Sequence, residues 1–100
     1  MKMIYINCNI SILTEILNVL EQEDTVDYQV IKEVTGKHRN GDPRFNTSVW
    51  PGYNAVIYAP FEDEDKARRI ITRLKDYNKS VHNDDEVLVC CSWNIDEYIC

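Results

Sequence analysis

The sequence predicts an α+β domain whose elements follow the order β-α-β-β-α-β. Two observations carry this prediction: four short runs of β-branched and aromatic residues, and two longer segments whose apolar residues recur at the period of a helix. The third observation is the length, because 100 residues is a common size for one domain. We therefore expect residues 1–100 to form a single domain with one core.

The first half of the chain predicts a strand, a helix and a second strand. Lys2 to Cys8 is a short apolar run typical of a strand. A helix follows, with Asn9 or Ser11 as its N-cap and the acidic stretch 21–24 at its end. The second strand is expected from Asp27 to Thr35. The apolar stripe of the helix consists of Leu13, Ile16, Leu17 and Leu20.

The second half repeats this pattern. A strand is expected from Tyr53 to Phe61, and a helix follows it with acidic residues at its start and basic residues after them, as the helix dipole favours. A turn from Asn78 to Asp85 leads to a last strand from Glu86 to Trp93. The tail from Asn94 to Cys100 is expected as one helical turn or a loose strand. The buried stripe of the second helix consists of Ala67, Ile70, Ile71, Leu74 and Tyr77.

This order of elements is the ferredoxin-like arrangement, in which two helices cover one face of an antiparallel sheet. Right-handed crossovers place both helices on the same face. Every expected strand is apolar on both of its faces, so the face without helices would expose a large apolar patch. Such patches mark partner surfaces, and we therefore expect an oligomer.

The segment from Gly36 to Gly52, between the second and third strands, is too long for a tight hairpin. Three basic side chains against one acidic side chain give it a net charge of +2, which leaves −8 for the rest of the chain. A loop of this length without periodicity is either a functional arm or a solvated polar loop. As an arm, it would grip an anion through Lys37, His38, Arg39 and Arg44.

The second helix carries three arginines that extend this hypothesis. Arg68, Arg69 and Arg73 would add positive charge to an anion site between subunits. The alternative is that Arg69 and Arg73 form surface ion pairs with the acidic stretch 62–65 before them.

Charge and composition exclude several classes of protein. With 17 acidic against 11 basic residues and a net charge of −6, the chain has no broad basic face for nucleic acid or an anionic membrane. No apolar run is long enough to span a bilayer, and no signal peptide is visible, so we expect a cytoplasmic protein. In that reducing compartment its four cysteines are expected as thiols.

With this layout, the sequence resembles the PII-like superfamily of small regulatory proteins over nearly its whole length. The resemblance is carried by the opening strand Lys2 to Ile6, by Gly36 after the second strand and by the long loop. It is carried most by the stretch from Thr47 to Asn54, which contains Trp50-Pro51-Gly52 and leads into an apolar third strand.

The resemblance implies a homotrimer in which three sheets pack their open faces around an axis. Loop 36–52 would be the T-loop, which contacts a target protein or senses an effector. ATP or ADP would be the candidate effector, bound between subunits near Gly36. The chain departs from the family after the second helix, where 78–83 replaces a Gly-rich turn, and after the last strand, where 92–97 replaces basic residues.

Two other functions remain as alternatives. The first is a metal-binding, CutA-like trimer, because Cys8 could approach Cys90 or Cys91 across neighbouring strands, with His38 as a further ligand. The other reading of these cysteines is that they are core thiols. Catalysis has the least support, and we expect no enzyme. Trp50 would stack on a ligand ring in the loop site or anchor the loop to the domain.

Overall fold

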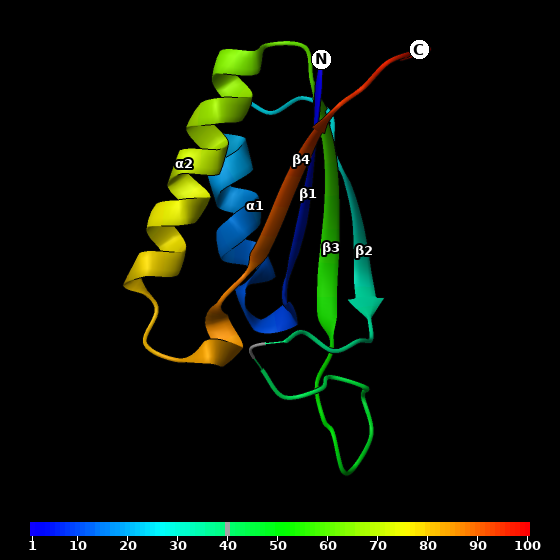
Figure 1. Cartoon of the computed structure of the whole chain (residues 1–100), viewed down its shortest axis with the longest axis vertical. Coiled ribbons are helices and arrows are strands. Elements are labelled where there is room, and N and C mark those ends of the chain that lie inside the picture. Colours follow the sequence, from blue (N-terminus) through cyan, green and yellow to red (C-terminus); the bar gives the residue numbers. More distant parts are fainter. Residues whose placement is uncertain (40) are drawn as a thin grey trace.

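The computed structural model describes residues 1–39 and 41–100 and confirms an α+β fold with one four-stranded sheet and two helices (Figure 1). There are also two single 3₁₀ turns in the described residues: η1 follows β1, and η2 precedes β4. The elements are β1 (Lys2–Asn9), η1 (Ile10–Ile12), α1 (Leu13–Gln22), β2 (Gln29–Val34), β3 (Asn54–Phe61), α2 (Glu64–Ser80), η2 (Asp84–Glu86) and β4 (Val89–Asn94).

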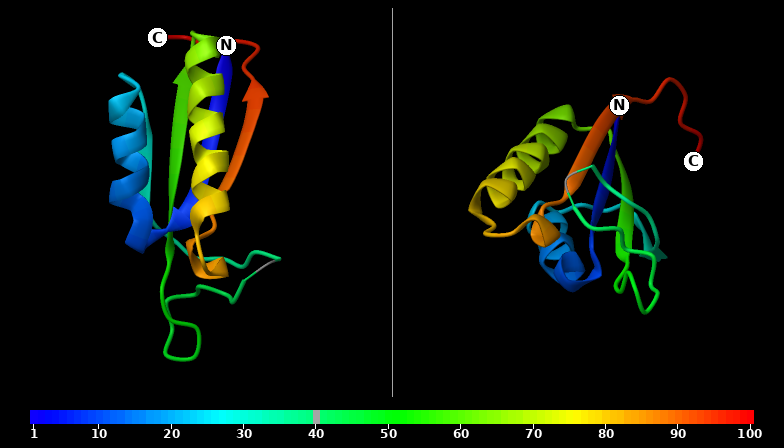
Figure 2. Two further views of the ribbon diagram at one scale, coloured as in Figure 1. Left: turned by 90° about the vertical axis from the view of Figure 1, so that its left-hand side faces the viewer. Right: turned by 60° about the horizontal axis from the view of Figure 1, so that its bottom comes forward.

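The sheet is antiparallel throughout, with the strand order β2-β3-β1-β4. β1 is therefore central, and its Ile6 pairs with Ile57 of β3 on one side and with Cys90 of β4 on the other. Both helices lie on the same side of the sheet (Figure 2). This is the split βαβ topology that the element order predicts.

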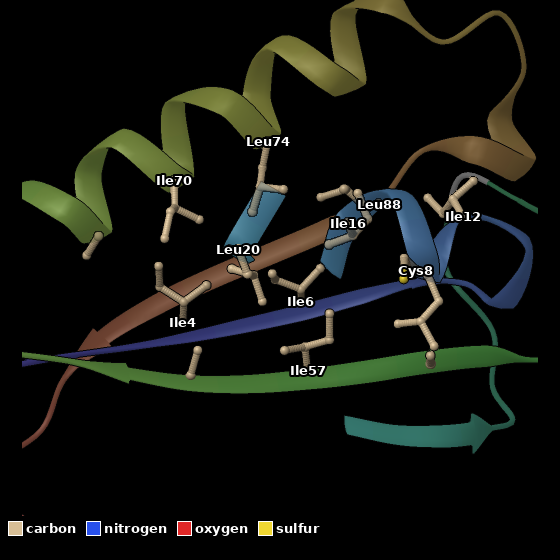
Figure 3. Close-up of a cluster of buried hydrophobic side chains, with 14 of the residues drawn as sticks. Ile4, Ile6, Cys8, Ile12, Ile16, Leu20, Ile57, Ile70, Leu74 and Leu88 are labelled. Carbon is tan, nitrogen blue, oxygen red and sulfur yellow. The ribbon is translucent and has the colours of Figure 1, made fainter. Parts of the chain in front are cut away.

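The core lies between the helices and the sheet (Figure 3). Side chains alternate along a strand, so every second residue of β1 and β3 points toward the helices. Each fully buried aliphatic side chain there contributes about 1.5–3 kcal/mol relative to exposure. The predicted stripes are confirmed, although Leu17, Ile71 and Tyr77 are only partly buried. The largest fully buried side chains are Ile4, Ile6, Cys8, Ile16, Leu20, Ile57, Ile70 and Leu74.

Side-chain oxygens cap both helical segments. Asn9 Oδ1 accepts a hydrogen bond from Ser11 N at 3.1 Å, so Asn9 caps η1, and α1 begins at Leu13 without a side-chain cap of its own. The prediction that Asn9 or Ser11 caps the first helix is therefore wrong for α1, because Asn9 caps the 3₁₀ turn before it. Asp63 Oδ1 accepts from Asp65 N and Lys66 N at 3.0 and 3.1 Å, which fixes the start of α2.

The last strand is shorter than its prediction. Residues 86–88 do not pair with β1; instead η2 is capped by Asn83 Oδ1, which accepts from Glu86 N at 3.2 Å. Asn78, the predicted start of a turn, lies inside α2 and bonds both backbone groups of Leu88, each at 2.9 Å. These side-chain bonds replace a strand ladder and bury Leu88.

β2 is also shorter than predicted and is irregular. Its register with β3 shifts between Ile31 and Val34, and the charged residues Lys32 and Glu33 in this interval are exposed. The tail after β4 forms neither a helical turn nor a strand. It is held by the Ile95 N–H, which donates to Met1 O at 2.9 Å, and by the Tyr98 hydroxyl, which donates to Asp27 Oδ2 at 2.8 Å. Among the described residues, no helix has both the length and the apolar character that a bilayer span requires.

Candidate functional site

The sheet face opposite the helices is apolar and aromatic, as the sequence predicts. Tyr5 pairs with Tyr58 of β3 and with Cys91 of β4, and the two tyrosine rings meet edge to face with centroids 5.4 Å apart. Tyr58, Trp93 and Ile31 are 37%, 44% and 49% exposed. By strand register, Asn7 and Gln29 are polar residues of this open face, and its other residues are Met3, Tyr5, Ile31, Val56, Tyr58, Pro60, Val89, Cys91 and Trp93.

Loop 36–52 extends beyond the start of β3 and borders this open face (Figure 1). Its first part is closed by a β-bridge, because Gly36 N donates to Arg44 O at 3.0 Å and Arg44 N donates to Gly36 O at 2.9 Å. Its second part is closed by Asn46 N, which donates to Gly52 O at 2.9 Å, with both residues at positive φ. The loop therefore has internal structure that its lack of periodicity did not predict.

The tip of the loop and its contact with the sheet edge are also hydrogen-bonded. Thr47 N donates to Trp50 O, and Trp50 N donates to Thr47 Oγ1, each at 3.0 Å. Asn46 Nδ2 donates to Glu33 Oε1 of β2 at 2.8 Å. The tip thus presents Val49, which is 74% exposed, and Trp50, which is 39% exposed, on a fixed turn.

Arg44 joins the loop to two other parts of the fold. Its side chain is 14% exposed; Nη1 donates to Asn54 Oδ1 at 3.0 Å, and Nη2 donates to Asp85 O at 2.9 Å. The Asp85 carboxylate also lies 3.4 Å from Nη2. Asn54 continues the network by donating to Asn7 Oδ1 at 2.7 Å, and Asn7 donates to the Tyr5 hydroxyl at 3.0 Å. A polar chain therefore connects η2, the loop and the open face.

A cavity of about 260 Å³ lies at the base of the loop, where this network meets the open face. Of the six residues predicted for the site, four line it: Gly36, Lys37, His38 and Arg44. Trp50 lines a neighbouring hollow of about 280 Å³, in which Arg44 is a shared wall. Arg39 lines neither cavity.

The cavity also contains residues that the sequence did not single out for the site. Asn7 and Asn54 supply amide groups, and Asp84 of η2 supplies a carboxylate. Asn7 is a polar residue in an otherwise apolar strand, and Asn54 directly follows the Trp50-Pro51-Gly52-Tyr53 stretch. These two signals could have identified them, whereas the position of Asp84 depends on the fold of η2.

Among the described residues, the cysteines do not gather with other metal ligands. Burial raises the pKa of the Cys8 and Cys90 thiols to about 11, so they remain protonated at neutral pH. Cys91 follows Cys90 in β4 and points to the other face of the sheet. In the part of the chain that the structure describes, no three His, Cys, Asp or Glu side chains come together as metal ligands. The metal-binding alternative therefore gains no support.

The arginines of α2 form surface ion pairs, but not mainly with the acidic stretch before them. Arg69 Nε and Arg73 Nη1 lie 3.1 and 3.3 Å from the two carboxylate oxygens of Glu23, the residue after α1. The hydrogen bond from Arg69 lowers the pKa of the Glu23 carboxyl, and Arg73 adds to this effect. Only Arg68 pairs with the preceding stretch, at 2.9 Å from Asp65. These arginines do not line the cavity at the loop.

Comparison with known proteins places the fold. No protein-family model matches the sequence, and no curated protein gives a significant match. Among solved structures, a PII-like signalling protein from Thermus thermophilus matches with a TM-score of 0.64 at 15% identity, over 94% of this chain and 85% of that chain. The chain has the fold of the PII-like proteins. The sequence resemblance to that superfamily is thus confirmed as a likeness of fold.

A second PII-like match comes from Thiomonas intermedia. CPII, a nitrogen regulatory PII-like protein, was solved with ADP, AMP and bicarbonate, and it matches with a TM-score of 0.68 at 11% identity over 96% of this chain and 88% of that chain. The apo form of CPII matches with a TM-score of 0.63, also at 11% identity, over 94% of this chain and 89% of that chain. The ligands in these structures belong to CPII, and the PII-like fold is what this chain shares with it.

Proposed function

We propose that this chain is a non-enzymatic regulatory protein of the PII-like group, which binds a small molecule in the cavity at the base of loop 36–52. One observation carries the proposal: four of the predicted site residues line one cavity where the loop, β3 and η2 are joined through Arg44. A ligand there touches the segments that hold the loop in place. It would change the order of the loop and so alter a contact with a target protein.

The proposal includes a homotrimer whose sheets pack their open faces together. Tyr58 and Trp93 are large side chains left 37% and 44% exposed on a face that carries apolar side chains from every strand. When copies of the chain bury this face against one another, each Å² of apolar surface removed from water stabilises the assembly by about 25 cal/mol. The cavity borders the same face through Tyr5 and Val89, so a neighbouring copy would form part of its wall.

The state of the cysteine thiols also agrees with a cytoplasmic regulator. All four cysteines are free, as in proteins of a reducing compartment. The protonated Cys8 and Cys90 thiols are poor nucleophiles, which favours binding over catalysis. The neighbour CPII binds adenine nucleotides, so ADP, AMP and ATP are the first ligands to test.

Two measurements test the proposal. Light scattering on a sizing column is expected to give the mass of about three 11.7 kDa chains, and Tyr58→Asp, which places a charge on the open face, is expected to give single chains. Hydrogen exchange is expected to slow in loop 36–52 when a small molecule from a panel of nucleotides and metabolites binds. A monomer whose loop exchange is unchanged by every compound in the panel would contradict the proposal.

A further inference from the structure

The cavity at the base of loop 36–52 is not the basic anion site that the charge of the loop implies. Lys37 and Arg44 contribute positive charge to its lining, but Asp42 and Asp84 contribute as many negative charges. Arg44 is moreover paired with Asp85 at 3.4 Å and bonded to Asn54, so much of its hydrogen-bonding capacity is already used. The lining thus offers Lys37 as a cation and the Asp42 and Asp84 carboxylates as anions.

This balance decides which ligands can enter. A polyphosphate would gain from Lys37 but would be repelled by Asp42 and Asp84, because like charges at close range disfavour binding. A purely cationic ligand would meet the opposite conflict at Lys37 and Arg44. A ligand with both signs of charge satisfies both groups. Within the described part of the chain, the side chains of Lys37, Asp42 and Asp84 make no hydrogen bond or ion pair, so they are available to it.

The size and polarity of the cavity narrow the class of ligand further. Drug-sized ligands occupy cavities of about 300–1,000 Å³, and this cavity of about 260 Å³ lies just below that range. Its remaining wall mixes the Asn7 and Asn54 amides with the Tyr5 ring and the aliphatic Val34 and Val89. Such a wall accommodates a short aliphatic chain between two charged ends.

We infer that this cavity binds a small zwitterion, a compound with an ammonium and a carboxylate group on a short aliphatic chain. The carboxylate lies toward Lys37 and the ammonium toward Asp42 and Asp84. This inference rests on the proposed function, because it names the class of effector for the same cavity.

The test compares compounds that differ only in charge. Calorimetric titrations of the wild-type protein use glycine, β-alanine and γ-aminobutyrate, which vary the distance between the two charges by one methylene at a time. Butyrate and butylamine carry the four-carbon chain with one charge only, and ADP represents the polyphosphates. We expect the best of the three zwitterions to bind at least tenfold more tightly than butyrate, butylamine or ADP, since one charge-assisted hydrogen bond contributes about that factor.

Two variants test the two ends of the ligand separately, and a third variant serves as the control. Asp42→Asn and Lys37→Gln each remove one exposed charge with little change of shape, and each is expected to weaken the best zwitterion about tenfold. Asp42→Asn is also expected to strengthen ADP, because it removes a repulsion. Arg39→Gln changes the same loop outside the cavity and is expected to bind as the wild type does.

The outcomes distinguish this inference from the proposed function. If ADP binds more tightly than all three zwitterions and slows hydrogen exchange in the loop, the inference is wrong and the proposed function stands. If a zwitterion binds best but Asp42→Asn and Arg39→Gln affect it equally, the inference is again wrong, because the ammonium does not lie at Asp42. If no compound binds and no member of the wider panel alters the loop, both are wrong.

Discussion

The replacement of Arg44 by Met is expected to loosen the loop and to destabilise the whole domain. Met retains most of the buried aliphatic volume of this side chain, which is 14% exposed, but removes its donors. Asn54 Oδ1 then loses its charged partner at 3.0 Å in a partly buried position. Asp85 O loses a donor at 2.9 Å but keeps the Asn9 amide at 3.3 Å and access to water.

The size of the effect follows from these three contacts. Leaving the Asn54 oxygen without a partner costs about 1–2 kcal/mol, in the lower part of the range for a group that is only partly buried. The ion pair with Asp85, whose side chain is 68% exposed, contributes less than about 1 kcal/mol. Arg44→Met is therefore expected to lower the free energy of unfolding by about 2 kcal/mol, which corresponds to about 10 °C in Tm for a domain of this size.

Urea unfolding followed by tryptophan fluorescence measures this loss, at one protein concentration because association shifts apparent stability. Hydrogen exchange on the same samples reports whether loop 36–52 opens. The matched control is Arg39→Met, which removes the same side chain from an exposed position outside the cavity and is expected to change stability by less than about 0.5 kcal/mol. Equal stability of the two variants would show that Arg44 does not hold the loop to the domain.

Three further predictions concern the core, the thiols and the surface charges. Ile6→Ala is expected to cost about 2–5 kcal/mol in urea unfolding, because Ile6 is fully buried in the central strand, whereas Met3→Ala in the same strand removes only partly buried atoms and should cost less. At pH 8, iodoacetamide is expected to modify exposed Cys100 first and Cys8 last, as followed by peptide mass spectrometry, because the Cys8 pKa of about 11 leaves little thiolate. Since Arg69 lowers the folded-state pKa of Glu23, its pairing stabilises the protein at neutral pH and is lost as pH falls through that lowered pKa. The wild type and Glu23→Gln should therefore differ in urea midpoint at pH 7, and this difference should shrink as the pH falls toward 3.

Each of these has a result that would count against it. If Ile6→Ala and Met3→Ala lowered the free energy of unfolding equally, the assignment of the core to the Ile6 face of β1 would be wrong. Labelling of Cys8 as fast as Cys100 would mean that the first strand is accessible to solvent. For Glu23, the control is Glu97→Gln in the exposed tail, which should be neutral at both pH values; a constant difference between wild type and Glu23→Gln from pH 7 to pH 3 would exclude the ion pairs as its cause.

The sequence predicted the elements and the core well because both depend on short periodic patterns. It failed where side chains replace the backbone ladder. Val87, Leu88 and Val89 form an apolar run, rich in β-branched residues, that is typical of a strand. However, Asn83 caps η2 and Asn78 bonds both backbone groups of Leu88, so pairing with β1 starts only at Val89. Those partners lie up to ten residues apart in the chain, and local periodicity carries no information about them.

The candidate site was only partly predictable for a similar reason. Composition and loop length directed attention to 36–52, and four of the six expected residues line one cavity. That this cavity binds a ligand stays a prediction. A count of charges, however, treats Arg44 as an available cation. Its partner Asp85 lies 41 residues away in the sequence, and Asp84 enters the cavity from the same turn. The electrostatic character of the site thus depends on long-range contacts.

The two outer strands determine how copies of this chain can add to one another. β2 and β4 each have one sheet neighbour, and a strand with a free edge is a template onto which another chain can pair and extend into fibres. In β2 the register shift, exposed Lys32 and Glu33 and the Asn46 contact all interrupt that template. Extension of the sheet through the β2 edge is thereby disfavoured, which agrees with the face-to-face packing proposed above.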